Sequence, residues 1–131
     1  MTENRLTILV VDDSPSNVDV LKNILASEYK VKVAISGAIA LKATEKDPPP
    51  DLILLDVIMP EMDGYEVCRR LKNNQITAAI PVLFVTGVAD EFDRLKGLSL
   101  GAGGFIMKPL DANKVLEAVR TALKGSKYLV T

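Results

Sequence analysis

Residues 51–56 read DLILLD, a continuous aliphatic run between two aspartates. Residues 6–11 (LTILVV) and 80–86 (IPVLFVT) have the same nearly unbroken apolar character. Runs of this length without polar alternation are typical of strands whose two faces are both covered, as in parallel sheets. These three segments therefore predict strands that are buried on both sides.

Further strands and intervening helices are expected along the rest of the chain. A fourth apolar run occupies 103–107 (GGFIM), and a weaker fifth run occupies 31–35 (VKVAI). Apolar residues at helical spacing lie between the runs. The expected helices are 15–28 with Ser14 as N-cap, 37–46, one marked by Val67, Cys68 and Leu71, one marked by Phe92, Leu95 and Leu98, and one marked by Val115, Leu116, Val119 and Leu123 with Asp111 as N-cap.

Strand and helix thus alternate five times, with connections short enough to require right-handed crossovers. This order predicts an α/β fold, a flavodoxin-like doubly wound five-stranded parallel sheet of (βα)5 type with strand order 2-1-3-4-5. In such sheets the functional crevice lies beyond the carboxyl ends of the strands.

Composition limits the possible classes of protein. A chain of 131 residues with 48% hydrophobic residues is the size of one domain. The net charge of −1 provides no basic surface for nucleic acid. No apolar stretch approaches the roughly 20 residues that cross a bilayer, so we expect a cytoplasmic protein without membrane contact.

The chain contains no histidine and a single cysteine, Cys68. Without histidine, Ser-His-Asp and Cys-His catalysis, the usual zinc sites and phosphohistidine chemistry are excluded. Cys68 lies in a predicted helix among apolar and basic residues, and we expect a buried structural thiol. Chemistry must therefore use carboxylates, lysine, hydroxyl groups and a hard cation.

Polar side chains follow the strands where their carboxyl ends should meet. They are Asp12, Asp13, Asp56, Thr86 and Lys108, the last followed by Pro109. Two carboxylates about 4 Å apart repel by about 4 kcal/mol at an effective dielectric constant of about 20, so a counterion is expected. An all-oxygen ligand set selects Mg²⁺ or Mn²⁺. A carboxylate beside such an ion and a lysine can attack an activated phosphorus and form an acyl phosphate.

Each of these residues also has an ordinary structural interpretation. The Asp12-Asp13 pair and Thr86 can cap helices, Asp56 can begin a turn, and Lys108 can be a solvated loop charge. Their joint location at one edge of the predicted sheet favours a functional site over these separate explanations.

Four segments resemble the signature sequences of response-regulator receiver domains, including the chemotaxis response regulator. They are ILVVDDSP (8–15), DLILLDVIMPEMDGYEVCRRLK (51–72), IPVLFVTG (80–87) and GAGGFIMKPL (101–110). The resemblance covers about residues 5–124 and implies a single receiver domain over 1–131, with 125–131 as a tail or linker stub.

The resemblance implies a signalling protein that catalyses only its own Mg²⁺-dependent phosphorylation and dephosphorylation. A sensor histidine kinase or phosphotransfer protein would supply the phosphoryl group. The implied roles are Asp56 as phospho-acceptor and metal ligand, Asp13 as direct metal ligand, Asp12 as ligand mainly through water, Ile58 as ligand through its backbone carbonyl, Thr86 and Lys108 as contacts to phosphoryl oxygens, Thr86 and Phe105 as switch residues, and Pro109 in a cis peptide bond with Lys108.

Phosphorylation would change the face formed by the fourth helix, fifth strand and fifth helix, which would contact an output domain, a partner or a second copy of the chain. Two departures from the family pattern affect this region. Where many family members have two acidic residues, this chain has Gly103 and Gly104, which are expected to loosen the loop into the strand and to remove charge near the output face. Phe105 stands where many relatives have tyrosine. Phenylalanine can rotate inward but gains only packing energy.

The residues two positions beyond Asp56 and Thr86, which flank the attacking water in this family, are Ile58 and Val88. Neither side chain can orient water. We therefore expect a comparatively long-lived phosphorylated form.

Three other classes of protein fit this sequence less well. A haloacid dehalogenase-type phosphohydrolase requires an acid two residues after the nucleophile, where this chain has Ile58. A flavin or nucleotide binder requires a glycine-rich loop after the first strand, but DDSPSN (12–17) is acidic. An inert interaction domain would lack the complete polar set. The sequence leaves open a free regulator, a phosphorelay intermediate or part of a longer protein.

Overall fold

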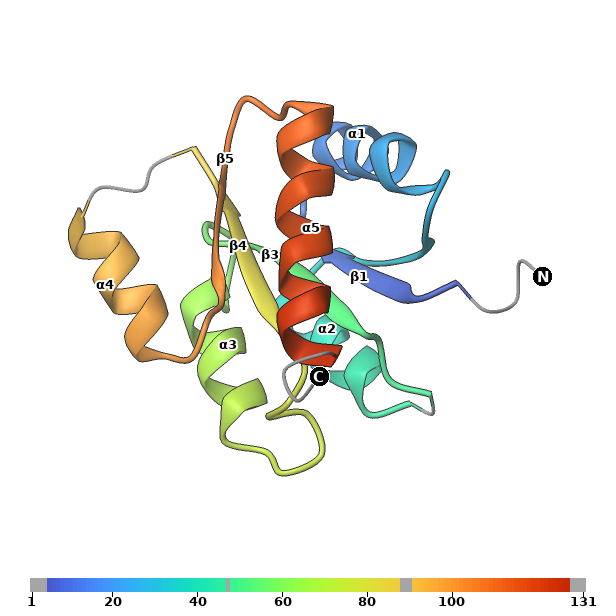
Figure 1. The fold of residues 1–131 in the computed structure, drawn as a ribbon. Coiled ribbons are helices and arrows are strands. Elements are labelled where there is room, and N and C mark those ends of the chain that lie inside the picture. Colours follow the sequence, from blue (N-terminus) through green and yellow to red (C-terminus); the bar gives the residue numbers. More distant parts are fainter. Residues whose placement is uncertain (1–4, 47, 88–90, 128–131) are drawn as a thin grey trace.

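The computed structural model describes residues 5–46, 48–87 and 91–127. Within these ranges, strands and helices alternate in the expected order (Figure 1). The strands are β1 (Thr7–Val11), β2 (Lys30–Ala34), β3 (Leu52–Asp56), β4 (Val82–Thr86) and β5 (Gly104–Met107). The helices are α1 (Pro15–Leu25), α2 (Gly37–Thr44), α3 (Gly64–Lys72), α4 (Glu91–Ser99) and α5 (Ala112–Lys127).

The strands form one parallel sheet in the order β2-β1-β3-β4-β5. This is the doubly wound flavodoxin-like arrangement that the alternation of strands and helices predicted. The central strands β3 and β4 are buried at every position. Their unbroken apolar sequence is explained by the helices that cover both faces of the sheet.

Alternate residues of β3 point to opposite faces of the sheet and enter different cores. Leu52 and Leu54 pack with residues of α1 and α5, whereas Ile53 and Leu55 pack with residues of α2 and α3. The helical residues of the first core include Val18, Leu21, Leu25, Val115, Val119 and Leu123, and those of the second include Ala40, Val67, Cys68 and Leu71. The sheet therefore lies between two helical layers (Figure 1).

The strand β2 differs from the interior strands because it lies at an edge. Lys30 and Lys32 are exposed, and Ala34 is buried. One outer edge of the sheet thus carries two lysines, which accounts for the weaker apolar signal of this segment.

Local signals in the sequence act as expected. The Ser14 hydroxyl accepts a hydrogen bond from Asn17 N at 3.5 Å, and Asp111 Oδ1 accepts one from Lys114 N at 3.1 Å, so both residues cap helices. Cys68 is fully buried, and desolvation raises the pKa of its thiol. The expectation of a buried structural cysteine is confirmed.

Several details differ from the sequence-based expectations. The helix α1 ends at Leu25 rather than near Glu28, because Glu28 N and Tyr29 N both donate to Leu25 O in a turn toward β2. The strand β4 begins after Pro81, which has no N–H for the ladder. The helix α5 continues through Lys127 and so includes residues 125–127 of the expected tail, while 128–131 lie outside the described residues.

The helix α4 was predicted from apolar residues that do not form a buried face. Leu95 is 62% exposed and Leu98 is 52% exposed. The side chain of Phe92 lies outside the described part of the structure. None of the helices within the described ranges is long and apolar enough to cross a membrane.

Gly64 determines how closely α3 approaches β3. Its N–H donates to Val57 O at 2.8 Å, and a Cβ at this position would lie 2.2 Å from the carbonyl oxygen of Asp56. A contact this short with backbone cannot be relieved by a side-chain rotation. The first turn of α3 therefore packs directly against the backbone at Asp56 because residue 64 has no side chain.

Replacing Gly64 with alanine is expected to destabilise the protein by about 2 kcal/mol, the usual range for overpacking. Gly103→Ala is the matched control, because a Cβ there would meet its nearest atom at an ordinary 3.7 Å. Chemical denaturation of both variants measures the difference. Equal stabilities would show that the contact between α3 and β3 relaxes freely.

Candidate functional site

The candidate residues lie where four neighbouring strands end. Asp12 follows the last residue of β1, Asp56 and Thr86 end β3 and β4, and Lys108 follows β5. The parallel register pairs Asp56 with Val85 and Thr86 with Met107, so these ends are level. The fold thus brings together residues that are up to about a hundred positions apart in the sequence, at the edge where a crevice was predicted.

Three carboxylates converge at this edge. One oxygen from each of Asp12, Asp13 and Asp56 can be chosen so that all lie within 4.8 Å of one another. Asp12 is 1% exposed and Asp56 is 6% exposed, whereas Asp13 is exposed to solvent. The carboxylates of Asp12 and Asp56 are therefore largely shielded from water. Inside the protein their mutual repulsion is poorly screened.

The Asp12 carboxylate is only partly satisfied by the protein. Its Oδ1 accepts a hydrogen bond from Ser14 N at 2.9 Å. Its Oδ2 is buried and has no hydrogen-bond partner among the described residues. A buried carboxylate oxygen without a donor is costly, so this atom indicates a place for a cation.

Lys108 supplies the positive charge closest to the carboxylates. Its Nζ donates to Asp56 Oδ1 at 3.4 Å and lies 3.8 Å from Asp12 Oδ2. Its backbone N–H donates to Thr86 O at 2.9 Å, which ties the lysine to the end of β4. The Lys108–Pro109 peptide bond is cis, as the resemblance implied.

The environment raises the pKa of Asp56 above its usual value. Burial is the largest cause, because it disfavours the charged form, and the neighbouring Asp12 charge adds to it. Lys108 opposes both effects, and Asp13 makes a smaller contribution in the same direction as Asp12. One lysine therefore does not fully compensate the negative charge of the site.

The donor set suits a hard divalent cation. All available side-chain ligands are carboxylate oxygens, and within the described residues no other group of three potential ligands is found. Magnesium prefers oxygen ligands and keeps several waters, so an open group of carboxylates at the protein surface is a fitting site for it.

Thr86 ends the strand that pairs with the strand of Asp56, and it lines a cavity of about 370 Å³. Thr86 is 2% exposed, whereas the Ile58 side chain is 72% exposed. The cavity is also lined by Val57, Met59, Asp63, Tyr65 and Asp93. Val88 lies outside the described residues.

Sequence reasoning did not identify Tyr65 or Asp93 as neighbours of Thr86. Tyr65 OH donates to Asp93 Oδ1 at 3.4 Å. Neither residue follows a strand directly, and their pairing depends on how α3 and α4 pack. No local sequence pattern would have revealed it.

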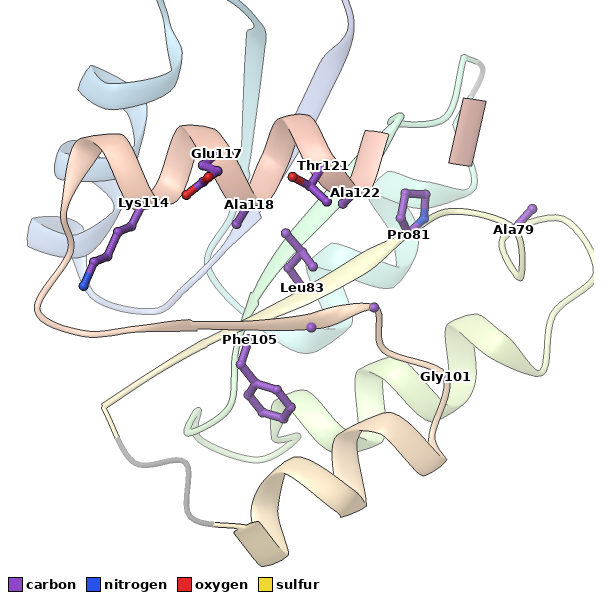
Figure 2. Close-up of a pocket in the computed structure, with 12 residues that line it drawn as sticks. Ala79, Pro81, Leu83, Gly101, Phe105, Lys114, Glu117, Ala118, Thr121 and Ala122 are labelled. Carbon is purple, nitrogen blue, oxygen red and sulfur yellow. The ribbon is translucent and has the colours of Figure 1, made fainter. Parts of the chain in front are cut away.

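A larger groove of about 660 Å³ lies away from the carboxylates, between α5 and β5 (Figure 2). Gly103 and Gly104 leave its floor without side chains, and Ala118 and Ala122 form part of the opposite wall. Phe105 projects from β5 toward the side opposite α5 (Figure 2). The chemistry-bearing residues thus do not line this groove.

Curated proteins are similar to this chain over most of its length. "Probable cyclic di-GMP phosphodiesterase" of Vibrio cholerae is 41% identical over 124 residues, which are 95% of this chain and 28% of that protein. "Response regulator PleD" of Caulobacter vibrioides is 45% identical over 115 residues, 87% of this chain and 25% of that protein. This chain thus spans about a quarter of the length of these relatives.

Solved structures share the fold over most of the chain. A response regulator receiver domain protein from Methanospirillum hungatei has a TM-score of 0.86 at 28% identity and covers 95% of this chain and 98% of its own. The signal receiver domain of a histidine kinase from Syntrophus aciditrophicus has a TM-score of 0.83 at 38% identity, with 93% and 92% covered.

The family described as "Response regulator receiver domain" matches residues 8–120, which include every candidate site residue. With the sheet order, the cluster of carboxylates and the relatives, this match identifies the chain as a member of the response regulator receiver domain family.

Proposed function

We propose that this receiver domain takes a phosphoryl group onto Asp56 in a Mg²⁺-dependent reaction. The supporting observation is the buried pair of Asp12 and Asp56, whose charges only Lys108 offsets within the described chain. The phosphoryl donor is a histidine kinase or a phosphotransfer protein. The domain is a signalling component rather than an enzyme with a separate substrate.

The metal ligands are the Asp13 carboxylate, the Asp56 carboxylate, the Ile58 backbone carbonyl and, mainly through water, Asp12. When bound, Mg²⁺, or Mn²⁺ in its place, supplies positive charge that offsets the carboxylates and the phosphoryl oxygens. The buried Asp12 Oδ2 supports this assignment, because none of the described residues donates a hydrogen bond to it and Lys108 Nζ is 3.8 Å away.

In the transfer step, a carboxylate oxygen of Asp56 attacks phosphorus as the bond to the donor nitrogen breaks. Lys108, already 3.4 Å from Asp56, neutralises charge on the phosphoryl oxygens. The Thr86 hydroxyl donates to another of these oxygens. The product is an acyl phosphate at the end of β3.

The added charge of about −1.5 to −2 draws Thr86 inward, and Phe105 occupies the space that is left. The face of α4, β5 and α5 then changes its shape and contacts an output domain, another protein or a second copy of the chain. The names of the longer relatives support an output domain, whereas the Syntrophus structure supports a place beside a kinase.

Residues 5–124 form the receiver core in this proposal, and the protein works in the cytoplasm, where histidine kinases present their phosphoryl groups. A phosphohydrolase of the haloacid dehalogenase type is disfavoured, because the side chain two residues after Asp56 is the apolar and exposed Ile58.

Asp56→Asn is expected to stabilise the metal-free protein at neutral pH by about 1 kcal/mol, because it removes a charge that burial and Asp12 disfavour. The pKa of Asp56 is higher in the folded than in the unfolded chain. Its favourable contribution is therefore complete below the unfolded pKa and is lost as pH rises through the folded pKa.

Chemical denaturation with a chelator present measures this effect, with the exposed Asp19→Asn as the isosteric control. Adding Mg²⁺ should stabilise the wild-type protein and the control by mass action, and stabilise Asp56→Asn much less. A metal-free Asp56→Asn variant that is less stable than the wild-type chain would contradict the crowded-charge description.

Incubation with acetyl phosphate and Mg²⁺ is expected to add one labile phosphoryl group to the wild-type chain, detected by intact mass. The Asp19→Asn control should accept it equally, Asp56→Asn should not, and Lys108→Ala should react about 100-fold more slowly. Chelation of the metal should abolish the reaction. Labelling of the Asp56→Asn variant would refute Asp56 as the acceptor.

The phosphorylated form is expected to be comparatively long-lived, because Ile58 and Val88 cannot orient the attacking water. Replacing both with asparagine should shorten the lifetime several-fold, measured as loss of the phosphoryl mass after the donor is removed. An unchanged decay rate would show that these positions do not control hydrolysis.

A further inference from the structure

Three aromatic rings form a row from α3 across β4 to β5. The Tyr65 ring meets the Phe84 ring edge-on, with 5.2 Å between centroids and an interplanar angle of 62°. The Phe84 and Phe105 rings are 5.4 Å apart and tilted by 34°. Phe84 is fully buried between the other two. The proposed switch residue Phe105 is thus connected by packing to the first turn of α3.

The helix α4 rests on this row with its backbone. A Cβ added to Gly97 would lie 2.6 Å from Cζ of Phe105 and 3.0 Å from Cε2 of Phe84. Figure 2 shows Phe105 pointing from β5 toward this helix. Any displacement of the ring of Phe105 therefore acts directly on the position of α4.

Two polar contacts join α4 to Tyr65 at the other end of the row. The Tyr65 hydroxyl donates to Asp93 Oδ1 at 3.4 Å, and Lys96 Nζ lies 4.4 Å from the centroid of the Tyr65 ring. Asp93 and Lys96 are three residues apart, so both side chains lie on one side of the helix. The phenol thus makes a hydrogen bond and a cation–π contact with the same helix.

Two leucines of α4 with described side chains take little part in this packing. Leu95 and Leu98 are more than half exposed, and β5 is the element against which α4 packs most. Because Phe105 has no hydroxyl, the only phenol of the row is that of Tyr65. The polar contacts from the row to α4 therefore depend on Tyr65.

Tyr65 is also close to the part of the site that should respond to phosphorylation. Tyr65, Thr86 and Asp93 line the same cavity of about 370 Å³. Thr86 ends β4, and Asp93 lies in the first turn of α4, the next helix in the sequence. A hydrogen bond that is already 3.4 Å long does not survive much further separation.

We propose that Tyr65 is a positioning residue that holds α4 against the ring row in the unphosphorylated chain, and that phosphorylation of Asp56 releases it. The release on phosphorylation rests on the proposed function, whereas the role in the unphosphorylated chain does not. Tyr65 then acts beside Thr86 and Phe105 in the switch, through Asp93 and Lys96, and supplies the polar contact that Phe105 lacks.

The holding role is tested by amide hydrogen exchange in the unphosphorylated chain. Tyr65→Phe keeps the ring and removes the hydroxyl, and it is expected to speed exchange of α4 amides about three- to tenfold, the range for losing one hydrogen bond. Tyr29→Phe is the matched control because Tyr29 packs in the core with α1 and α5. Unchanged exchange in α4 of Tyr65→Phe would overturn the proposal.

Specificity for the Asp93 contact is tested by a double-mutant cycle. Asp93→Ala removes the acceptor of this hydrogen bond, so alone it should also speed exchange in α4. Combining it with Tyr65→Phe should add little, because both changes remove the same interaction. Fully additive effects would show that the two side chains act separately and would also overturn the proposal.

The release is tested after phosphorylation, with occupancy of Asp56 measured separately by intact mass. Exchange in α4 of the phosphorylated wild-type chain should approach that of Tyr65→Phe, and the variant should change less. If Asp56 carries the phosphoryl group but the amide exchange rates in α4 of the wild-type chain do not change, the proposed release of α4 is wrong and the proposed function stands. If Asp56 takes no phosphoryl group, the proposed function and the release both fail, and the unphosphorylated comparison alone decides the holding role.

Discussion

The central constraint on the structure is the repulsion between buried carboxylates at the carboxyl ends of the strands. Asp12 and Asp56 are both nearly inaccessible to water and share one lysine, Lys108. Burial and mutual repulsion raise the pKa of Asp56, so the ligand-free chain stores an electrostatic cost where chemistry is proposed. A cation and a phosphoryl group arriving together would replace that cost with favourable contacts. This is why a site of such composition suits a reversible charge-driven switch.

The remainder of the fold keeps the charges in place. The strands that end at Asp56 and Thr86, and the strand just before Asp12, are mostly apolar and lie between helical layers. Their ends therefore cannot separate without opening a core. Gly64 brings the first turn of α3 onto the backbone at Asp56. The parts that are expected to move are next to these strand ends, namely α4 and the ring of Phe105 that packs against it. A rigid set of charges beside a weakly held helix allows a local event to have a distant effect.

The sequence predicted the order and type of every element and the convergence of Asp12, Asp13, Asp56, Thr86 and Lys108. Both follow from patterns along the chain, namely buried runs and the residues that follow them. The orientation of α4 was not predictable in this way. Leu95 and Leu98 have helical spacing, but the helix turns Gly97 to the core instead, because only a residue without a side chain fits against Phe84 and Phe105. The Tyr65–Asp93 contact escaped prediction for the same reason, since it depends on packing between distant helices.

The lysines of β2 have a consequence for the behaviour of the chain in concentrated solution. A parallel sheet that is not closed into a barrel exposes backbone donors and acceptors at its outermost strand, and these can recruit strands from other molecules. Lys30 and Lys32 place two positive charges along that margin. Two copies of the chain that approached each other by this edge would bring like charges together. This repulsion disfavours the addition of a strand from another molecule to β2.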